Sequence, residues 1–407
     1  MLILLGLLSN LLMRVVFVEL SDFDIAVRTI AEKIIQLEKN RNNLSKVLRD
    51  AYQYLNLELI QNTVSDQEVI EPKFIHEVVP LDLHGMQIIG IDGSIISKSL
   101  NGVDLILTRA VAVLFKFQKD KPSVQYFPSS APNPRLIYNF EIFSGPELDV
   151  LNSLERLEDE IQIAIKMTDQ NPDIILLDGS IIPLTLDKPS NSSILNQKYF
   201  KIIENYELLF QKCLEHDILL AGIIKDTRST RFMQILGKVL PALINKVPEL
   251  QSIRQLDYRP IIQQTRDATF LYRFLQPKER TFTFKYSESP AKHAVLKDFT
   301  KKDWSQLIYT FYLKPVQFDL PTKIEFLAPT NPEKYANRIA AVILPLSNQH
   351  AEFGVPSVLI EADARAHLFE NDLEYIHESL SHVVSTSGFS PLLMKLRRDK
   401  RPFRSKK

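Results

Sequence analysis

Residues 88–94 read Ile-Ile-Gly-Ile-Asp-Gly-Ser, and residues 174–180 read Ile-Ile-Leu-Leu-Asp-Gly-Ser. Each stretch is a short apolar run that ends in Asp-Gly-Ser, and residues 218–226 form a third such run that ends in Lys225-Asp226. Continuous apolar runs are typical of strands that are covered on both faces, as in α/β sheets. The sequence therefore predicts an α/β protein with three strands that each end at a carboxylate: Asp92, Asp178 and Asp226.

The segments around these runs indicate the order of the elements. Residues 103–108, 110–117 and 124–127 are rich in β-branched and aromatic residues, which favours two or three antiparallel strands. Apolar residues recur at helical spacing over 146–168, and a second helical stretch covers 196–216. A strand, a hairpin, a helix and a further strand in this order are typical of the ribonuclease H-like fold. We expect such a mixed sheet flanked by helices, with an N-terminal helical arm and an inserted α+β region.

The residue patterns outside these elements indicate how the chain divides into domains. Residues 21–59 have a helical pattern that Ser21 and Asp22 can cap, and they suit a paired-helix arm or a dimerisation element. The expected divisions are an N-terminal helical arm and linker at 1–85 (with the polar run 61–71 as the linker), a main domain at 86–385 with an insertion at about 230–330, and a basic tail at 386–407.

Composition limits the class of protein. The 49 Lys and Arg residues balance 49 Asp and Glu residues, so the net charge is zero. This balance excludes a protein that binds nucleic acid through net positive charge, and leaves only a local basic lining. The single cysteine, Cys213, excludes a disulfide framework and a cysteine-based zinc site. We therefore expect a reducing, cytoplasmic setting.

The first residues raise the question of a membrane. Residues 1–12 are almost wholly apolar, but the charge of Arg14 follows the run, whereas a signal peptide has its charge before it. A spanning helix needs about 20 apolar residues, and Arg14 and Glu19 interrupt that count. We expect a packed helix rather than a membrane anchor, or a start codon placed upstream of the true start at Met13.

Carboxylates at the ends of neighbouring strands suggest a metal site, because ligand sites of α/β sheets lie beyond the carboxyl ends of the strands. Converging carboxylates repel one another unless they share a cation, and oxygen-rich sites suit Mg²⁺ or Mn²⁺. Two such ions can support phosphodiester hydrolysis. The plainer alternative is that Asp-Gly-Ser only makes a turn.

A ribonuclease H-like site also needs an acidic residue on the helix over 146–168. Glu155, Glu158 and Glu160 are the candidates. In helical projection Glu158 lies at the edge of the apolar stripe, Glu160 points away and Glu155 lies further off. The stripe used for this projection consists of Leu151, Leu154, Ile161 and Ile165. We therefore favour Glu158.

Four segments together resemble the NurA nuclease family: residues 88–94, 174–180, 222–229 (Gly-Ile-Ile-Lys-Asp-Thr-Arg-Ser) and 354–368 (Gly-Val-Pro-Ser-Val-Leu-Ile-Glu-Ala-Asp-Ala-Arg-Ala-His-Leu). The resemblance covers roughly 86–385. It implies a ribonuclease H-like core and a DNA nuclease that depends on Mn²⁺ or Mg²⁺, with two ions expected. It also implies 5′ to 3′ degradation, single-strand endonuclease activity, a homodimer, and a hexameric HerA-like translocase as partner in DNA end resection and repair.

The resemblance also assigns roles to residues. Asp92 and Asp178 match the two Asp-Gly-Ser aspartates of the family, which are metal ligands, and Glu158 takes the place of the helix glutamate. Lys225 takes the place of a lysine that contacts a phosphate, so these four residues form the expected catalytic set. Asp226 beside it can instead be solvated.

The late segment departs from the family pattern. Family members carry a tyrosine and, eight residues later, a histidine, where this chain has Val355 and Asp363. Asp363 can still bind a metal, so it joins the expected ligands, but Val355 can do no polar chemistry. Tyr375 and His377 lie further along the chain and are weak candidates to substitute.

Basic residues after the third strand are candidates for DNA binding. Arg228 and Arg231 follow Lys225 closely. A second set can line a groove or offer stacking faces: Arg266, Tyr272, Arg273, Phe274, Lys278 and Arg280. The blander reading is a solvated surface with aromatic residues in the core.

Two other functions remain open. A catalytically weak or inactive adaptor for DNA or a translocase would explain Val355 and Asp363. An actin-like phosphotransferase also has an Asp-Gly strand end, but it needs a glycine-rich loop late in the chain, and no glycine lies between Gly237 and Gly354.

Overall fold

The computed structural model describes residues 2–60, 68–118 and 121–388. The chain forms two compact units. The helical unit consists of Met1–Val64 and Arg228–Phe274, and the sheet unit consists of Ser65–Thr227 and Leu275–Lys407. Part of the expected linker, residues 61–67, and most of the expected basic tail, residues 389–407, lie outside the described residues.

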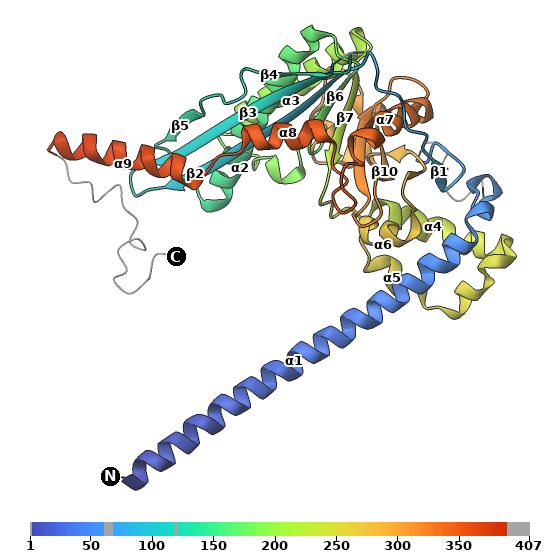
Figure 1. Ribbon diagram of the computed structural model, residues 1–407, viewed down its shortest axis with the longest axis horizontal. Coiled ribbons are helices and arrows are strands. Elements are labelled where there is room, and N and C mark those ends of the chain that lie inside the picture. Colours follow the sequence, from blue (N-terminus) through green and yellow to red (C-terminus); the bar gives the residue numbers. More distant parts are fainter. Residues whose placement is uncertain (1, 61–67, 119–120, 389–407) are drawn as a thin grey trace. The chain divides into compact units, whose positions relative to one another are not determined.

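One mixed sheet organises the sheet unit (Figure 1). Its strands, within the described ranges, are β1 Ile75–Glu77, β2 Gln87–Ser99, β3 Asp104–Lys116, β4 Ser123–Phe127, β5 Arg135–Asn139, β6 Ile174–Asp178, β7 Leu219–Ile224, β8 Glu279–Thr281, β9 Phe284–Lys285, β10 Ile308–Lys314 and β11 Thr322–Leu327. The main order is β1-β8-β10-β11-β7-β6-β2-β3-β4, with β5 beside β3 and β9 beside β10.

The centre of this sheet confirms the predicted ribonuclease H-like fold. β2, β6 and β7 are parallel neighbours, and β3 pairs antiparallel with β2 along its whole length. The two strands expected over 103–117 are one long strand, β3. β5 and β10 were not among the predicted strands; β10 reads Ile-Tyr-Thr-Phe-Tyr-Leu-Lys, a β-branched and aromatic run that is typical of a strand.

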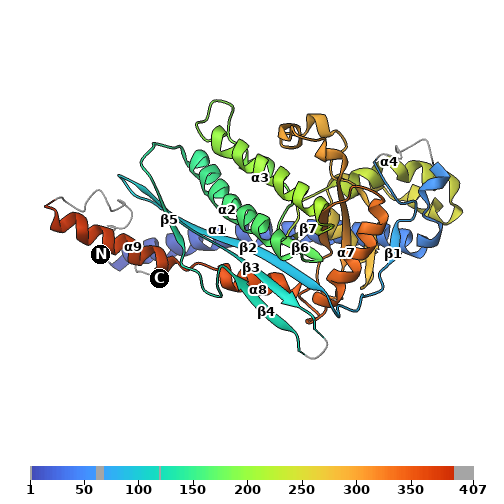
Figure 2. The same ribbon diagram turned by 90° about the horizontal axis from the view of Figure 1, so that it is seen from above.

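Helices cover both faces of the sheet. They are α2 Gly145–Met167, α3 Asn196–Glu215, α7 Pro332–Leu346, α8 Ser357–Ala366 and α9 Glu370–Thr386. α2 and α3 lie side by side on one face (Figure 2), and α8 lies along β2 and β3 on the other (Figure 1). Alternate residues of β2 therefore enter different cores, Ile89 under α2 and α3 and Ile88 under α7 and α8. α8 and α9 are separate helices, because the helical backbone is interrupted between Ala366 and Glu370.

The helical unit contains α1 Leu2–Asp50, α4 Arg231–Lys246, α5 Tyr258–Gln263 and α6 Asp267–Phe274. α1 continues through Ser21 and Asp22, so the predicted helix start there is wrong. Its last turns are held by Arg41, which donates hydrogen bonds to the Thr265 hydroxyl and the Gln264 carbonyl. The predicted insertion at 230–330 divides at Leu275, because the later half adds strands to the sheet.

No helix in the described part of the chain has both the length and the apolar character that crossing a membrane requires.

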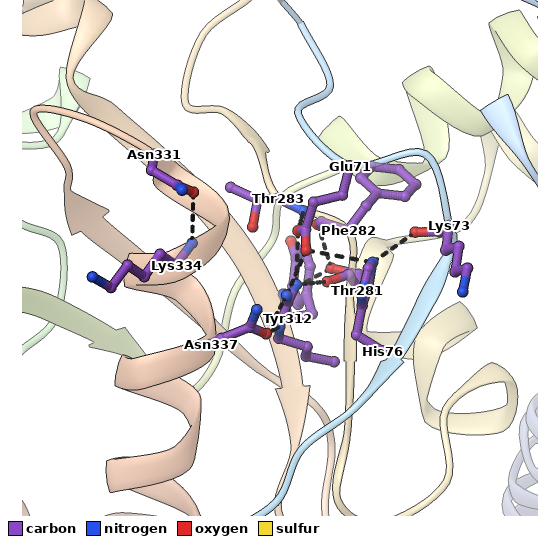
Figure 3. Close-up of polar contacts among 11 residues, drawn as sticks. Glu71, Lys73, His76, Thr281, Phe282, Thr283, Tyr312, Asn331, Lys334 and Asn337 are labelled. Atoms are coloured by element: carbon purple, nitrogen blue, oxygen red, sulfur yellow. Dashed lines mark hydrogen bonds and ion pairs between the residues drawn. The ribbon is translucent and has the colours of Figure 1, made fainter. Parts of the chain in front are cut away.

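A fully buried ion pair fastens the segment before β1 to the sheet. Figure 3 shows its surroundings, with Glu71 and Asn337 labelled. Arg280 on β8 and Glu71 both have side chains that are 0% exposed, and Arg280 Nη1 donates to Glu71 Oε2 at 2.8 Å. Asn337 of α7 accepts a further hydrogen bond from Arg280 Nε at 3.0 Å. The expectation that Arg280 lines a DNA groove is therefore wrong, because its guanidinium is buried and already bound to Glu71. Arg273, from the same set, pairs with Glu38 of α1.

Candidate metal centre

Asp92 and Asp178 are neighbours at the edge where β6 ends. β2 and β6 run in parallel register up to the pair Ile91–Leu177, and the two aspartates are the next residue on each strand. β6 ends at Asp178, as predicted. β2 does not end at Asp92, because it continues to Ser99 against β3. The first Asp-Gly-Ser is therefore not a turn. It lies within β2, at the point where β6 ends and no longer pairs with it.

The helix carboxylate at this edge is Glu160. A Cβ atom added to Gly93 would lie 2.5 Å from Glu160 Oε1, so the carboxylate of α2 occupies the space that a side chain on β2 would need. The glycine of the first Asp-Gly-Ser is required for this close approach. Glu160 is therefore packed directly beside Asp92.

Glu158 lies on the side of α2 opposite to Glu160, so the prediction that it is the helix carboxylate of the metal site is corrected. Its carboxylate pairs with Lys198 and lies 3.5 Å from Lys201 Nζ, both on α3. The helical projection failed because the four apolar residues on which it was based place the centre of the buried face too close to Glu158. The buried face of α2 also includes Leu157, Ala164 and Met167, whereas Ile165 is only partly buried. These residues turn the sheet-facing side toward Glu160.

The carboxylates of this edge have raised pKa values, first because they are buried and then because they repel one another. Burial raises the pKa of Asp92 to about 8, with the charges of Asp178, Glu160 and Asp363 adding to the effect. Burial also raises the pKa of Glu160 to about 7, against the nearby charge of Arg156. The pKa of Asp178 is raised by burial as well, although Lys225 opposes the shift. Buried neighbouring carboxylates with raised pKa values are typical of functional sites.

Two cations partly neutralise the centre. Lys225 Nζ lies 2.5 Å from Asp178 Oδ2, so the predicted lysine does reach the site. Arg156, one turn before Glu160 on α2, lies 2.5 Å from Glu160 Oε1 through Nη1. The prediction missed Arg156, although its i,i+4 spacing to Glu160 is a readable signal. Asp226, beside Lys225, is exposed.

Asp363 of α8 acts on the centre through its charge. It is exposed, and its charge raises the pKa of both Asp92 and Asp178. Val355 is buried in the core that α7 and α8 cover, so it is a packing residue.

The substitutes considered for the missing tyrosine and histidine lie elsewhere. Tyr375 and His377 are on α9, whose Leu373 belongs to one buried cluster with Leu105 and Leu107 of β3. Leu107, the nearer of the two, is four residues from Val111, the β3 partner of Asp92, or roughly 13 Å along the strand. α9 therefore does not supply the candidate centre with these side chains.

A second polar cluster holds the turn after β6. Gly179 has φ +123°, a conformation that favours glycine. The Ser180 hydroxyl donates to Glu325 Oε2 of β11 at 2.5 Å, and Lys323 Nζ lies 2.7 Å from Glu325 Oε1. Glu325, which sequence reasoning missed, thus fixes the turn directly after Asp178.

The donor set suits a hard divalent cation in its chemistry. All the donors are carboxylate oxygens, which Mg²⁺ and Mn²⁺ prefer. Within the described part of the chain, no three His, Cys, Asp or Glu side chains are placed to hold an ion as they stand. Asp178 and Glu160 instead hold Lys225 and Arg156.

The predicted DNA-binding arginines belong to the other unit. Arg228 is exposed and begins the second segment of the helical unit, and Arg231 is the first residue of α4. The carboxylates and Lys225 all belong to the sheet unit.

Comparisons with known proteins identify the family. The NurA domain profile matches residues 86–368, well over half of the chain. A search of curated proteins returned no match. Similar solved structures include the NurA nuclease from Sulfolobus solfataricus (14% identity, TM-score 0.48, covering 88% of this chain and 98% of that one). Another is a NurA structure with manganese (12% identity, TM-score 0.42, covering 88% of this chain and 97% of that one). The match over residues 86–368 shows that this chain belongs to the NurA domain family.

Proposed function

We propose that this protein is a metal-dependent deoxyribonuclease that hydrolyses phosphodiester bonds. The observation that carries the proposal is the grouping of Asp92, Asp178, Glu160 and Asp363 at one edge of the sheet of a NurA domain. A solved NurA structure bound to dAMP and manganese is among the similar structures, which is in keeping with a nucleotide and a metal as ligands.

In this proposal Asp92, Glu160 and Asp178 are the metal ligands, with Asp363 as a further ligand from α8. Bound Mn²⁺ or Mg²⁺, with two ions expected, would supply an activated water and neutralise charge on the leaving oxygen. The chain itself positions the carboxylates: β2 and β6 hold the aspartates in register, and α2 presents Glu160 through the gap at Gly93. Lys225 then contacts a phosphate of the DNA.

The finer assignments rest on family membership. They are 5′ to 3′ exonuclease and single-strand endonuclease activity, a role in end resection and DNA repair, and a HerA-like translocase as partner. Arg228 and Arg231 remain proposed DNA contacts. The divisions of the chain at 85 and 385 remain proposals too.

The homodimer has support from α1. Its described side chains after Asp22 include several exposed apolar ones, among them Phe23 at 67%, Ile30 at 57% and Ile34 at 55%. A helix with so many exposed apolar side chains is typical of an association surface. We propose that α1 contributes to association between two copies.

The second candidate function is a catalytically weak adaptor for DNA or a translocase. Two observations favour it: Val355 is a core residue, and Asp363 is the polar group that α8 contributes in place of the family's histidine. An adaptor of this kind would retain the fold and DNA binding but cleave DNA slowly in every divalent metal.

Cleavage of end-labelled DNA in Mn²⁺ tests the proposal. We expect Asp92→Asn and Glu160→Gln to reduce the rate at least about 100-fold, because each removes a ligand charge. Glu158→Gln is the matched control on the same helix, and we expect it to stay within about threefold of wild type. Equal rates for wild type and Asp92→Asn would refute the site, and a wild type that cleaves no DNA would favour the adaptor.

A further inference from the structure

Lys225 and Arg156 cover the candidate metal centre in the same way. Each lies 2.5 Å from a carboxylate oxygen, on Asp178 and Glu160 respectively. The carboxylate side chains are 16% and 14% exposed, whereas the lysine and arginine side chains are 31% and 29% exposed. Each cation is therefore more exposed than the carboxylate with which it pairs.

The charges of the centre do not balance. Asp92, Glu160, Asp178 and Asp363 carry four negative charges when ionised, whereas Lys225 and Arg156 carry two positive charges, so these six side chains together have a net charge of −2. Among the described residues no cation pairs with Asp92 itself, whose carboxylate accepts a hydrogen bond from the Gly93 N–H at 2.7 Å. One divalent ion would neutralise these six side chains as they stand. A second ion would overcharge them unless the two cationic side chains moved away.

We propose that Lys225 and Arg156 are exchangeable counter-ions, which occupy Asp178 and Glu160 until divalent metal binds and then transfer to phosphates of the DNA. The inference rests on the proposed function. Lysine carries its ammonium on a flexible four-carbon stem, and the arginine fork matches phosphate oxygens, so both side chains suit either partner. Such counter-ions weaken metal binding and strengthen DNA binding. A permanent structural ion pair does not have these opposite effects.

Metal affinity tests the first effect. Mn²⁺ binding to the full chain is measured by calorimetry for wild type, Lys225→Met and Arg156→Met. We expect both variants to bind Mn²⁺ about 3- to 30-fold more tightly, because the competing charge is gone. Lys198→Met is the matched control: Lys198 is similarly shielded, at 23% exposed, and pairs with Glu155 and Glu158 away from the centre. It should bind Mn²⁺ as wild type does, and so should Lys225→Arg, which keeps the charge.

DNA affinity tests the second effect. Binding of a nuclease-resistant phosphorothioate oligonucleotide in saturating Mn²⁺ is followed by fluorescence anisotropy. We expect Lys225→Met and Arg156→Met to bind it about tenfold more weakly, because each loses a phosphate contact, and Lys198→Met to bind it as wild type does.

The outcomes separate this inference from the proposed function. Folded methionine variants that bind Mn²⁺ no more tightly than wild type, or DNA equally well, would overturn the exchange. If the methionine variants do not fold, Lys225→Gln and Arg156→Gln carry the same test, because an amide can donate to the carboxylate without a charge. A wild type that binds Mn²⁺ and cleaves DNA while these variants behave like Lys198→Met overturns the exchange alone. A wild type that binds no Mn²⁺ overturns both proposals.

Discussion

Two charged clusters in the sheet unit have opposite electrostatic character. At the Glu71–Arg280 pair, burial would raise the pKa of Glu71, but the hydrogen bond and charge of Arg280 outweigh it and lower the pKa below 4.5. At the candidate metal centre, burial and neighbouring carboxylates raise the pKa of Asp92 to about 8. The first cluster satisfies its charges and holds the fold together. The second leaves the Asp92 carboxylate without a cation partner among the described residues, which is the arrangement expected of a site that binds a ligand.

The largest expected stability effect concerns the satisfied cluster. Arg280→Met should lower the free energy of unfolding by about 3–5 kcal/mol, because it leaves the buried Glu71 carboxylate without its cation. Chemical denaturation measures the loss. The double variant Glu71→Leu/Arg280→Met is the control and should recover much of it, since no charge is then left buried. A double variant less stable than Arg280→Met would contradict this account of the pair.

The unsatisfied cluster should respond in the opposite direction. Asp92→Asn removes a carboxylate that is destabilised first by burial and then by its neighbours, so we expect the metal-free protein to gain about 1–3 kcal/mol of stability. The same variant should lose most of the stabilisation that Mn²⁺ gives to wild type. Thermal melts with and without Mn²⁺ measure both effects, and a less stable metal-free Asp92→Asn would show that the carboxylate is not repelled.

The two clusters should also differ in pH dependence. The pKa of Glu71 is lowered on folding, so its contribution is present above about pH 4.5 and is lost as the pH falls below that value. The pKa of Asp92 is raised from 3.8, so its penalty is absent at low pH and grows up to about pH 8. The stability gain of Asp92→Asn over wild type should therefore increase from pH 4 to pH 8. A gain that is constant with pH would contradict the raised pKa.

The smallest expected effect concerns the outer flank of α2. Glu158 pairs with Lys198 and with the largely exposed Lys201, so Glu158→Gln should cost only about 0–1 kcal/mol. Chemical denaturation of Glu158→Gln, compared with wild type and with Glu160→Gln, measures this change in the free energy of unfolding. A loss of several kcal/mol in Glu158→Gln would show that the bridge to α3 matters more than its geometry indicates.

The sequence predicted the fold well where local patterns were strong. The apolar runs at 88–91 and 174–177 became the parallel pair β2 and β6, and the helical spacing over 146–168 became α2. The extent of β2 was not predictable, because Asp-Gly-Ser is a turn signal and the pairing with β3 that overrides it is a tertiary contact. The reach of α1 past Ser21 was missed because capping residues also occur inside helices.

The candidate site was predictable at the strand ends and not on the helix. Asp92 and Asp178 are neighbours as the apolar runs indicated, because parallel strands place their ends together, and Lys225, which the resemblance assigned, pairs with Asp178. Choosing between Glu158 and Glu160 required the rotation of α2, and that rotation depends on how Ala164 and Met167 pack into the core. A helical projection alone does not contain this information.

A crystal structure of the wild-type protein soaked in Mn²⁺ tests the central claim most directly. We predict an anomalous peak bounded by the carboxylates of Asp92, Asp178 and Glu160, with the Lys225 ammonium and the Arg156 guanidinium displaced from their partners. A peak at Glu158, or a well-occupied ion elsewhere with Asp92 unliganded, would contradict the account.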